Sequence, residues 1–379
     1  MTETILLIDD DQIITEGLGA ALQCEGRTII TCNDIESAEL IVERLHPSHV
    51  VTDVRLSGPF AFEGLDFVRF VRRHAPESRV VLMSGQTSDA IRREATERGA
   101  VALLSKPFGI GELDAVLDMS APPSSIESMV EHPVIRVPLL EELLGSKDLR
   151  PFFQPIVSLD GAKRVIGYES LARFRTDSPL CNPEMMFRYA ARKRRVIDLE
   201  LACLAATMRA ATSLPATASI FVNVHPFAFH EEACLVEHLE RGLANSGLAA
   251  GRFVVEITEQ APLPAGPGLV NTIAAIRNLG MRFAFDDVGV AYSHLPFMDL
   301  VRPAYLKISQ DFGSDFEKDA TRTKIVKNIA SLAADFGCQT ILEGIEEPST
   351  ARAAELLDIP LGQGYLFGRP MDVCEPIAA

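Results

Sequence analysis

The chain has 379 residues, which is longer than a typical single domain. With 47% apolar and 23% charged residues it has the composition of a globular protein, which excludes disordered and collagen-like proteins. Its formal net charge of −16 repels polyanions and argues against a nucleic-acid polymer as a partner. No apolar run approaches the ~18 residues of a membrane span, and Met1–Asp10 lacks the basic start of a secretion signal, so we expect a cytoplasmic protein with no membrane partner.

The first 118 residues alternate short apolar, β-rich segments with helical patterns. This alternation predicts an α/β domain with a doubly wound, five-stranded parallel sheet of the flavodoxin-like kind. The strands are predicted at residues 4–8, 27–31, 49–52, 79–83 and 100–104.

Residues 119–148 are predicted to be a linker. The stretch Ala121-Pro122-Pro123-Ser124-Ser125 is rich in residues that break helices and strands. A short amphipathic helix is predicted over 138–149, and its apolar face serves either plain packing or a signalling connection. We therefore expect three parts, with a first domain at 1–118, the linker at 119–148 and a second domain at 149–379.

The second domain again alternates strand-like and helix-like segments. Strands are predicted at 153–157, 166–172, 219–224, 253–258, 282–285, 304–308, 339–342 and 364–367, with helices such as 198–211, 269–279 and 323–336 between them. Eight strands over this length predict a (β/α)8 TIM-like barrel. The first two segments have no obvious helix between them, so the barrel is expected to have an irregular first strand.

Charged and hydroxyl side chains end the strands of the first domain. Asp9 and Asp10 follow the first strand, and like charges at a sheet edge require a cation. Asp53 ends the third strand, Ser84 the fourth, and Lys106 follows the fifth, so all converge at one edge. These groups suit phosphoryl transfer to a carboxylate. The alternative is a purely structural role, in which Asp53 caps a helix and Lys106 is solvated.

These residues, within LLIDDD, VVTDVRL, VLMSG and LLSKPF, resemble the receiver domain of bacterial response regulators. The resemblance implies phosphorylation of Asp53 by a cognate sensor histidine kinase, one Mg²⁺ held by Asp9 and Asp10, and Ser84 and Lys106 as phosphate contacts. Two departures stand out, since Leu103 replaces the usual aromatic switch and the segment 58–64 is longer than usual.

Polar side chains, most of them with oxygen atoms, end nearly every predicted barrel strand. The rim residues are Glu169, Asn223, Glu256, Glu259, Asp286, Asp287, Lys307, Glu343, Glu346 and Gln363. A single acid at a strand end is usually a helix cap, but so many around one rim would repel each other unless cations lay among them. Oxygen ligands favour Mg²⁺ or Mn²⁺ over zinc. Adjacent Asp286 and Asp287 suggest one carboxylate bridging two metals, as in two-metal phosphodiester hydrolysis.

The motifs resemble the EAL family of cyclic di-GMP phosphodiesterases from about residue 149 to 370. They include Glu169-Ser170-Leu171 in place of the tripeptide that names the family, LK, and QGYLFGRP. The resemblance implies hydrolysis of cyclic di-GMP to linear pGpG with two Mg²⁺ or Mn²⁺ ions, by a homodimer.

Carried over by position, the resemblance assigns roles to these residues. Glu169, Asn223, Glu256 and Asp286 would hold the first metal and Asp287 the second, with Glu346 a further oxygen ligand. Lys307 would contact a phosphate or the attacking water, Glu343 would bind metal or act as general base, and Gln363 would orient that water or the second site. Glu259 would anchor the loop after the double aspartate, and Arg173 would face a substrate phosphate.

Two departures leave a second reading open. The loop after Asp287 reads Val288-Gly289-Val290-Ala291, and Ser309 stands where the family has an acid. The leading hypothesis is a phosphodiesterase regulated by phosphorylation. The alternative is a cyclic di-GMP sensor that binds without turnover, and a pure interaction protein is the third class.

Overall fold

The computed structural model describes residues 3–56, 63–85, 88–117, 134–145, 148–174, 178–230, 232–258, 262–264, 266–289 and 295–373. By their contacts the residues form two compact units, one of Met1–Asp148 with Phe174–Val196 and one of Leu149–Arg173 with Ile197–Ala379. Within the described ranges, none of the helices has both the length and the apolar character needed to cross a bilayer. The domain boundaries taken from the sequence stay a prediction.

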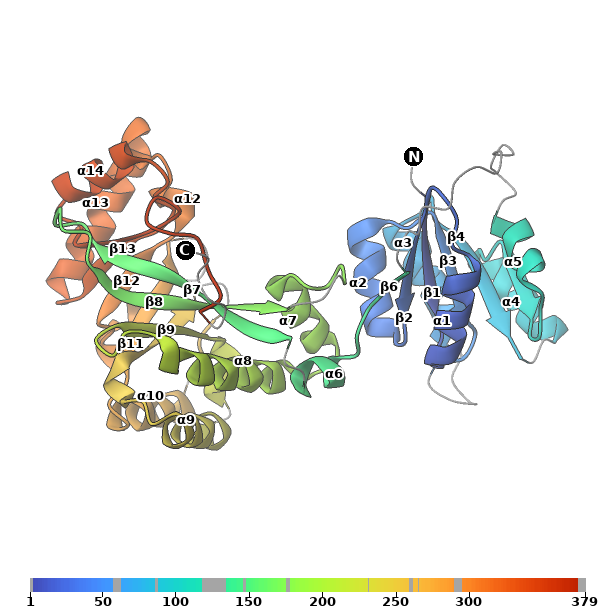
Figure 1. The fold of residues 1–379 in the computed structure, drawn as a ribbon, viewed down its shortest axis with the longest axis horizontal. Coiled ribbons are helices and arrows are strands. Elements are labelled where there is room, and N and C mark those ends of the chain that lie inside the picture. Colours follow the sequence, from blue (N-terminus) through green and yellow to red (C-terminus); the bar gives the residue numbers. More distant parts are fainter. Residues whose placement is uncertain are drawn as a thin grey trace. The chain divides into compact units, whose positions relative to one another are not determined.

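The first unit is built on a parallel sheet with helices on its faces (Figure 1). The strand order β5-β4-β3-β1-β2-β6 confirms the flavodoxin-like topology, whose order reverses between β1 and β3. The strands are β1 (Glu3–Ile8), β2 (Arg27–Cys32), β3 (His49–Asp53), β4 (Arg79–Ser84), β5 (Ala102–Ser105) and β6 (Val134–Arg136). The helices are α1 (Gln12–Ala21), α2 (Ile35–Leu45), α3 (Glu63–His74), α4 (Asp89–Arg98), α5 (Ile110–Leu117), α6 (Leu140–Gly145) and α7 (Pro183–Arg192).

Among the described residues the sheet of the first unit has six strands, one more than the five predicted, and the additional strand is β6. This strand lies inside the predicted linker and pairs with β2, where Ile29 faces Val134. Three residues are too few to produce a visible pattern in the sequence, and the strand forms because the edge of β2 offers unpaired backbone groups. The short helix expected after it is present as α6.

Helix α7 groups with the first unit through charged contacts to α2. Arg192 Nη2 lies 2.7 Å from Glu43 Oε1, and its Nη1 lies 2.9 Å from Glu39 Oε2. The hydroxyl of the buried Tyr189 donates to Asp34, which also caps α2 by accepting from the Ser37 amide. Residues from the part of the chain predicted to be barrel are thus attached to the first unit.

The second unit is a closed barrel in the order β10-β11-β12-β13-β14-β7-β8-β9, with helices around it (Figure 1). Its strands are β7 (Leu149–Ser158), β8 (Val165–Phe174), β9 (Ser219–Val224), β10 (Phe253–Thr258), β11 (Arg282–Val288), β12 (Tyr305–Ile308), β13 (Gln339–Leu342) and β14 (Leu361–Gln363). Its helices are α8 (Val196–Ala210), α9 (Glu232–Ser246), α10 (Pro267–Asn278), α11 (Met298–Val301), α12 (Gln310–Gly313), α13 (Ala320–Asp335) and α14 (Pro348–Leu356).

The irregular first strand is confirmed, because β7 pairs antiparallel with β14, whereas β8 to β14 run parallel. The last strand was misplaced by the sequence prediction, which put it at 364–367 instead of Leu361–Gln363. The aromatic run after Gly364 belongs to a turn. A Cβ at Gly364 would lie 2.1 Å from the Ile345 carbonyl oxygen, so the chain bends here against the neighbouring loop.

One layer of apolar side chains fills the interior of the barrel. It comprises Ile156, Phe221, Val254, Ala284, Tyr305, Ile341 and Leu361, each from a different strand. Because side chains alternate between the two faces of a strand, the residue two positions along each strand also points inward. This layer therefore forms the floor on which the next inward layer rests.

Candidate metal and phosphodiester site

The polar rim residues occupy the inward layer directly above the apolar floor. For the strands β9 to β14, one rim residue lies two residues after a floor residue, as Glu256 does after Val254 and Lys307 after Tyr305. The same spacing yields Asn223, Asp286, Glu343 and Gln363. Strand alternation thus explains how residues far apart in the sequence converge at one mouth.

A bulge in β11 allows both aspartates of the adjacent pair to face this mouth. Pairing of β11 with β12 shifts register between Phe285 and Val288. Asp287 adopts a left-handed backbone, with φ of 55°, which is uncommon outside glycine. In a regular strand, consecutive side chains would point to opposite faces, so the bulge is the feature that brings Asp286 and Asp287 together.

Lys307 lies at the centre of the site and is fully buried. Its Nζ is 2.9 Å from Glu256 Oε1, 2.9 Å from Asp286 Oδ1, 2.8 Å from Glu343 Oε1 and 3.4 Å from Glu169 Oε2. Four ionised carboxylates around a single ammonium leave an excess of negative charge in a site shielded from water. Such an arrangement is costly unless protons or cations balance it.

The pKa values of these acids reflect that excess. Burial raises the pKa of Glu256 well above its ordinary value, and it raises the pKa of Asp286 to about 6 and that of Glu343 to about 8, since Lys307 compensates only in part. Burial would also raise the pKa of Glu169, but the charge of Lys307 and hydrogen bonds outweigh it and lower the value. The carboxylates outnumber the positive charges that the protein supplies.

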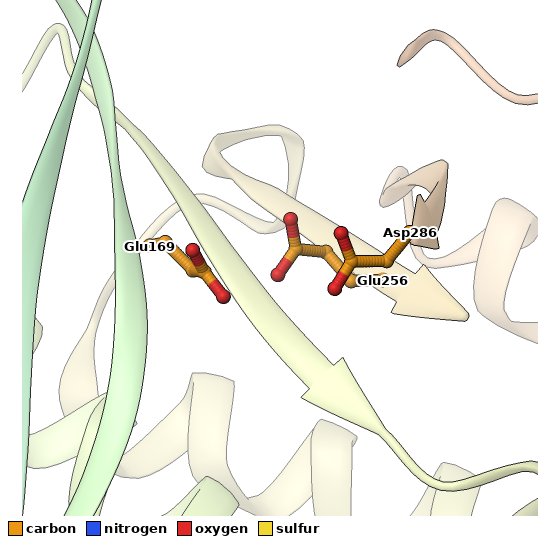
Figure 2. Close-up of side chains that lie close together, drawn as sticks. All are labelled: Glu169, Glu256 and Asp286. Carbon is orange, nitrogen blue, oxygen red and sulfur yellow. The ribbon is translucent and has the colours of Figure 1, made fainter. Parts of the chain in front are cut away.

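Two overlapping groups of carboxylates have the geometry of metal ligands. Glu169, Glu256 and Asp286 form one group and Asp286, Asp287 and Glu343 the other, with ligand atoms within 4.8 Å of one another in each. Figure 2 shows Glu169, Glu256 and Asp286 projecting from separate strands into one space. Oε2 of Glu256 is buried and accepts no hydrogen bond from the described residues, and the only cation paired with Oε1 of Glu256 and Oδ1 of Asp286 there is the Lys307 ammonium. Such oxygens would suit hard divalent cations, and Asp286 belongs to both groups.

Amide side chains hold the carboxylate of Glu169 in place. Asn223 Nδ2 donates to Glu169 Oε1 at 3.1 Å, and Gln363 Nε2 donates to Glu169 Oε2 at 2.5 Å and to Gln154 Oε1 at 3.1 Å. Gln154, 8% exposed on β7, is a site residue that the sequence prediction missed. Because β7 runs in the opposite direction, its rim residue lies two positions before the floor residue Ile156. A glutamine among the apolar residues of that strand was the available signal.

The other predicted site residues belong to neither carboxylate group or lie outside the described ranges. Arg173, near the end of β8, donates from Nη1 to the Ala172 carbonyl at 2.8 Å. Glu346 is exposed and belongs to neither group, so its role as a ligand gains no support. Glu259 is outside the described residues. Ser309 caps α12 by accepting from the Asp311 amide, so the serine has a local structural role.

The first unit has a smaller polar site at the edge where the strand order reverses. Lys106 Nζ lies 2.6 Å from Asp9 Oδ2 and 2.5 Å from Asp53 Oδ2. Burial raises the pKa of Asp9, and the hydrogen bond from Lys106 offsets this only in part. Ser84 is buried at the end of β4, and Asp10 is exposed. Asp9, Asp53 and Lys106 therefore meet as expected, at a place suited to a cation and a phosphoryl group.

Glu200 is a buried acid outside both sites. It lies on α8, is 3% exposed, and accepts a hydrogen bond from the His225 amide at 3.3 Å. Burial raises its pKa to about 8, against an ordinary value of 4.5. Between these values the folded protein holds a proton that the unfolded chain has released, so the free energy of unfolding falls as pH rises, by up to about 1.4 kcal/mol per pH unit.

We expect Glu200→Gln to remove this pH dependence, because glutamine does not titrate. Relative to the parent, the variant should gain stability progressively from about pH 5 to pH 8. Urea unfolding of both proteins at several pH values measures the difference. Parallel stability curves over this range would show that the carboxyl does not hold a proton in the folded state.

Two family models match the chain. The EAL domain model matches residues 139–370, and the response regulator receiver domain model matches residues 5–118. The first match contains the barrel strands with their carboxylates, and the second contains Asp9, Asp53 and Lys106. Each polar site thus lies inside one matched segment.

Named proteins resemble all or part of the chain. The cyclic di-GMP phosphodiesterase RocR of Pseudomonas aeruginosa is 26% identical over 360 residues, covering 91% of this chain and 90% of RocR. The probable cyclic di-GMP phosphodiesterase PdeN of Escherichia coli is 25% identical over 226 residues, which are 58% of this chain and 43% of PdeN. The manganese and cyclic di-GMP complex of Klebsiella pneumoniae BlrP1 is 26% identical with a TM-score of 0.53, covering 60% of this chain and 57% of that one.

Proposed function

Because the chain belongs to the EAL domain family and carries a receiver domain ahead of that domain, we propose that it hydrolyses cyclic di-GMP to linear pGpG under the control of Asp53 phosphorylation. The similarity to RocR along nearly the whole of both chains supports this combination. The observation that carries the proposal is the pair of carboxylate groups that share Asp286 around the buried Lys307. This is the arrangement that two-metal phosphodiester hydrolysis needs.

The ligand set suits Mg²⁺ or Mn²⁺ in the barrel. Glu169, Asn223, Glu256 and Asp286 would hold one ion, and Asp286 and Asp287 the other. When bound, the two ions supply an activated water and stabilise the attacking and leaving oxygens. In the receiver, Asp9 and Asp10 would hold one Mg²⁺ beside Asp53.

The protein's own groups position these ligands and the substrate. Gln363 and Asn223 orient Glu169 by hydrogen bonds, which fixes the direction of its lone pairs. Lys307 supplies the fixed positive charge for a phosphate oxygen. Glu343, whose Oε1 lies 2.8 Å from the Lys307 ammonium, would act as the base that accepts a proton from the water. Arg173 would face a phosphate of the substrate. Glu259 would anchor the loop that follows Asp286 and Asp287.

The activity is tested by incubating the purified chain with cyclic di-GMP and Mg²⁺ or Mn²⁺ and separating the nucleotides by chromatography. We expect linear pGpG to appear, and chelation of the metal to stop its formation. Binding of cyclic di-GMP without product would favour the sensor reading, which Ser309 motivates because it caps a helix where the family has an acid. Absence of both binding and product would leave an interaction protein.

We expect Asp53 to be the phosphoacceptor, with a sensor histidine kinase as donor. Its carboxylate lies beside Lys106 at the edge where an acyl phosphate would be neutralised. A small-molecule phosphodonor should label the parent, whereas Asp53→Ala should remain unlabelled in Phos-tag electrophoresis. Asp66→Ala, at an exposed acid on α3, is the control and should be labelled like the parent. Labelling retained in Asp53→Ala would point to another acceptor.

The same proposal includes the location, the oligomeric state and the partners of the protein. We place the protein in the cytoplasm as a homodimer, with cyclic di-GMP as its ligand and neither a membrane nor a nucleic-acid polymer as a partner. The net charge of −16 supports the last point, since the nucleotide is held through metals and not through a basic surface.

A further inference from the structure

An exposed aromatic ring follows strand β9 at the same end of the barrel as Asn223. The chain turns after β9 into a short helix, η2 (Pro226–His230). Phe227 in this turn is 58% exposed, although its neighbours Ala228 and Phe229 are buried. Phe227 therefore presents a large, partly exposed apolar surface at this end of the barrel.

The ring of Phe227 is paired with the imidazole of His225. Their centroids lie 5.2 Å apart, and the two planes are inclined by 12°, so the rings are stacked. The amide of Phe227 donates to His225 Nδ1 at 3.2 Å. This bond closes the turn upon itself and fixes the orientation of the imidazole under the phenyl ring.

The base of the ring pair is anchored in the protein interior. The His225 amide donates to the buried carboxyl of Glu200 at 3.3 Å, and the His225 carbonyl accepts from the Ala228 amide at 2.8 Å. The turn is therefore held from both ends, and Phe227 is presented outward without the freedom of an ordinary loop side chain. A preorganised aromatic surface binds a flat ligand at a lower entropic cost.

We propose that Phe227, supported by His225, is a stacking platform for one guanine base of the dinucleotide. This inference rests on the proposed function and assigns a purine subsite at the same end of the barrel as Asn223. Every nucleobase has a π-face that stacks on aromatic side chains, and Phe227 adds no charge that would repel the adjacent phosphate. Phe227 would therefore recognise a base of the substrate, whereas Lys307 and the cations that the carboxylates would hold contact its phosphate.

The first test separates KM from kcat. For Phe227→Ala we expect KM for cyclic di-GMP to rise by about 5- to 150-fold, the range for the loss of one base–aromatic stack, while kcat changes little. Phe227→Tyr should restore KM. Phe336→Ala is the matched control, since Phe336 is 50% exposed but precedes β13 and so lies at the opposite end of the barrel.

The second test uses the absence of tryptophan from the sequence. Phe227→Trp introduces a single indole, whose fluorescence should be quenched as cyclic di-GMP stacks upon it, with saturation at the dissociation constant measured by calorimetry. Phe336→Trp should show no quenching. Calorimetry with Mn²⁺ alone should give the same affinity for Phe227→Ala and the parent, which excludes an indirect effect on the metal ligands.

Three results would overturn the subsite. These are an unchanged KM in Phe227→Ala, a fall in kcat alone, or a change in Mn²⁺ affinity, which would mark Phe227 as structural. If the parent binds cyclic di-GMP without cleaving it, the dissociation constant replaces KM, so the subsite is tested although the proposed hydrolysis fails. A parent that shows no binding would refute both.

Discussion

Replacing Glu169 by alanine is expected to abolish hydrolysis of cyclic di-GMP. Glu169 belongs to the first carboxylate group and is oriented by two amide donors, so its loss removes a ligand that no neighbour replaces. We expect kcat to fall by about a thousandfold or more, comparable with the removal of a group that stabilises the transition state directly. Chromatography of the nucleotides after incubation with Mn²⁺ measures the loss.

The control for Glu169→Ala is a variant that replaces a glutamate of the same unit outside the carboxylate site. Glu355→Ala meets this condition, because Glu355 is exposed on α14 and should leave turnover as it is in the parent. Calorimetric titration with Mn²⁺ adds a direct readout, since Glu169→Ala should bind the metal more weakly than Glu355→Ala. Turnover of Glu169→Ala within a few-fold of the parent would show that the ligand assignment is wrong.

The site could be predicted from the sequence where strand direction and alternation are regular. In strands such as β10 and β12, an apolar residue followed two positions later by a polar one marks the floor and the rim of the barrel, as with Val254 and Glu256. That pattern is local and depends only on the pleat of the strand. The convergence of these residues then follows from closing the barrel.

The prediction failed where the backbone leaves this pattern. Gln154 was missed because β7 runs antiparallel to β14, which reverses the order of floor and rim. The last strand was misplaced because Gly364 bends the chain before an aromatic run that resembles a strand. The adjacent aspartates were predicted to act together, but alternation alone would separate them, and the bulge in β11 resolves the conflict. The two failures and the bulge all depend on tertiary pairing, which a local pattern does not contain.

Replacing Lys307 by methionine is expected to destabilise the metal-free protein strongly. Methionine keeps the length of the side chain but removes the ammonium from among Glu256, Asp286, Glu343 and Glu169. Because the acids stay buried without their counter-charge, the free energy of unfolding should fall by about 3–5 kcal/mol, the usual cost of removing one partner from a buried ion pair. Hydrolysis should be lost as well.

Metal and pH should modulate this loss in a defined way. In urea unfolding followed by circular dichroism, the difference from the parent should be largest in EDTA at pH 8 and smaller at pH 5, where carboxyl groups with raised pKa values take up protons. Mn²⁺ should stabilise Lys307→Met more than the parent, because the cations then supply the missing charge.

Lys318→Met is the control for removing a lysine. Lys318 pairs with Asp315 at 2.7 Å, but both side chains are more than half exposed, so water screens the pair and unfolding should be unaltered. Equal stability of Lys307→Met and the parent in EDTA at pH 8 would mean that the four acids are already neutral in the metal-free protein. In that case the buried ammonium would not be what holds the carboxylates together before the metals bind.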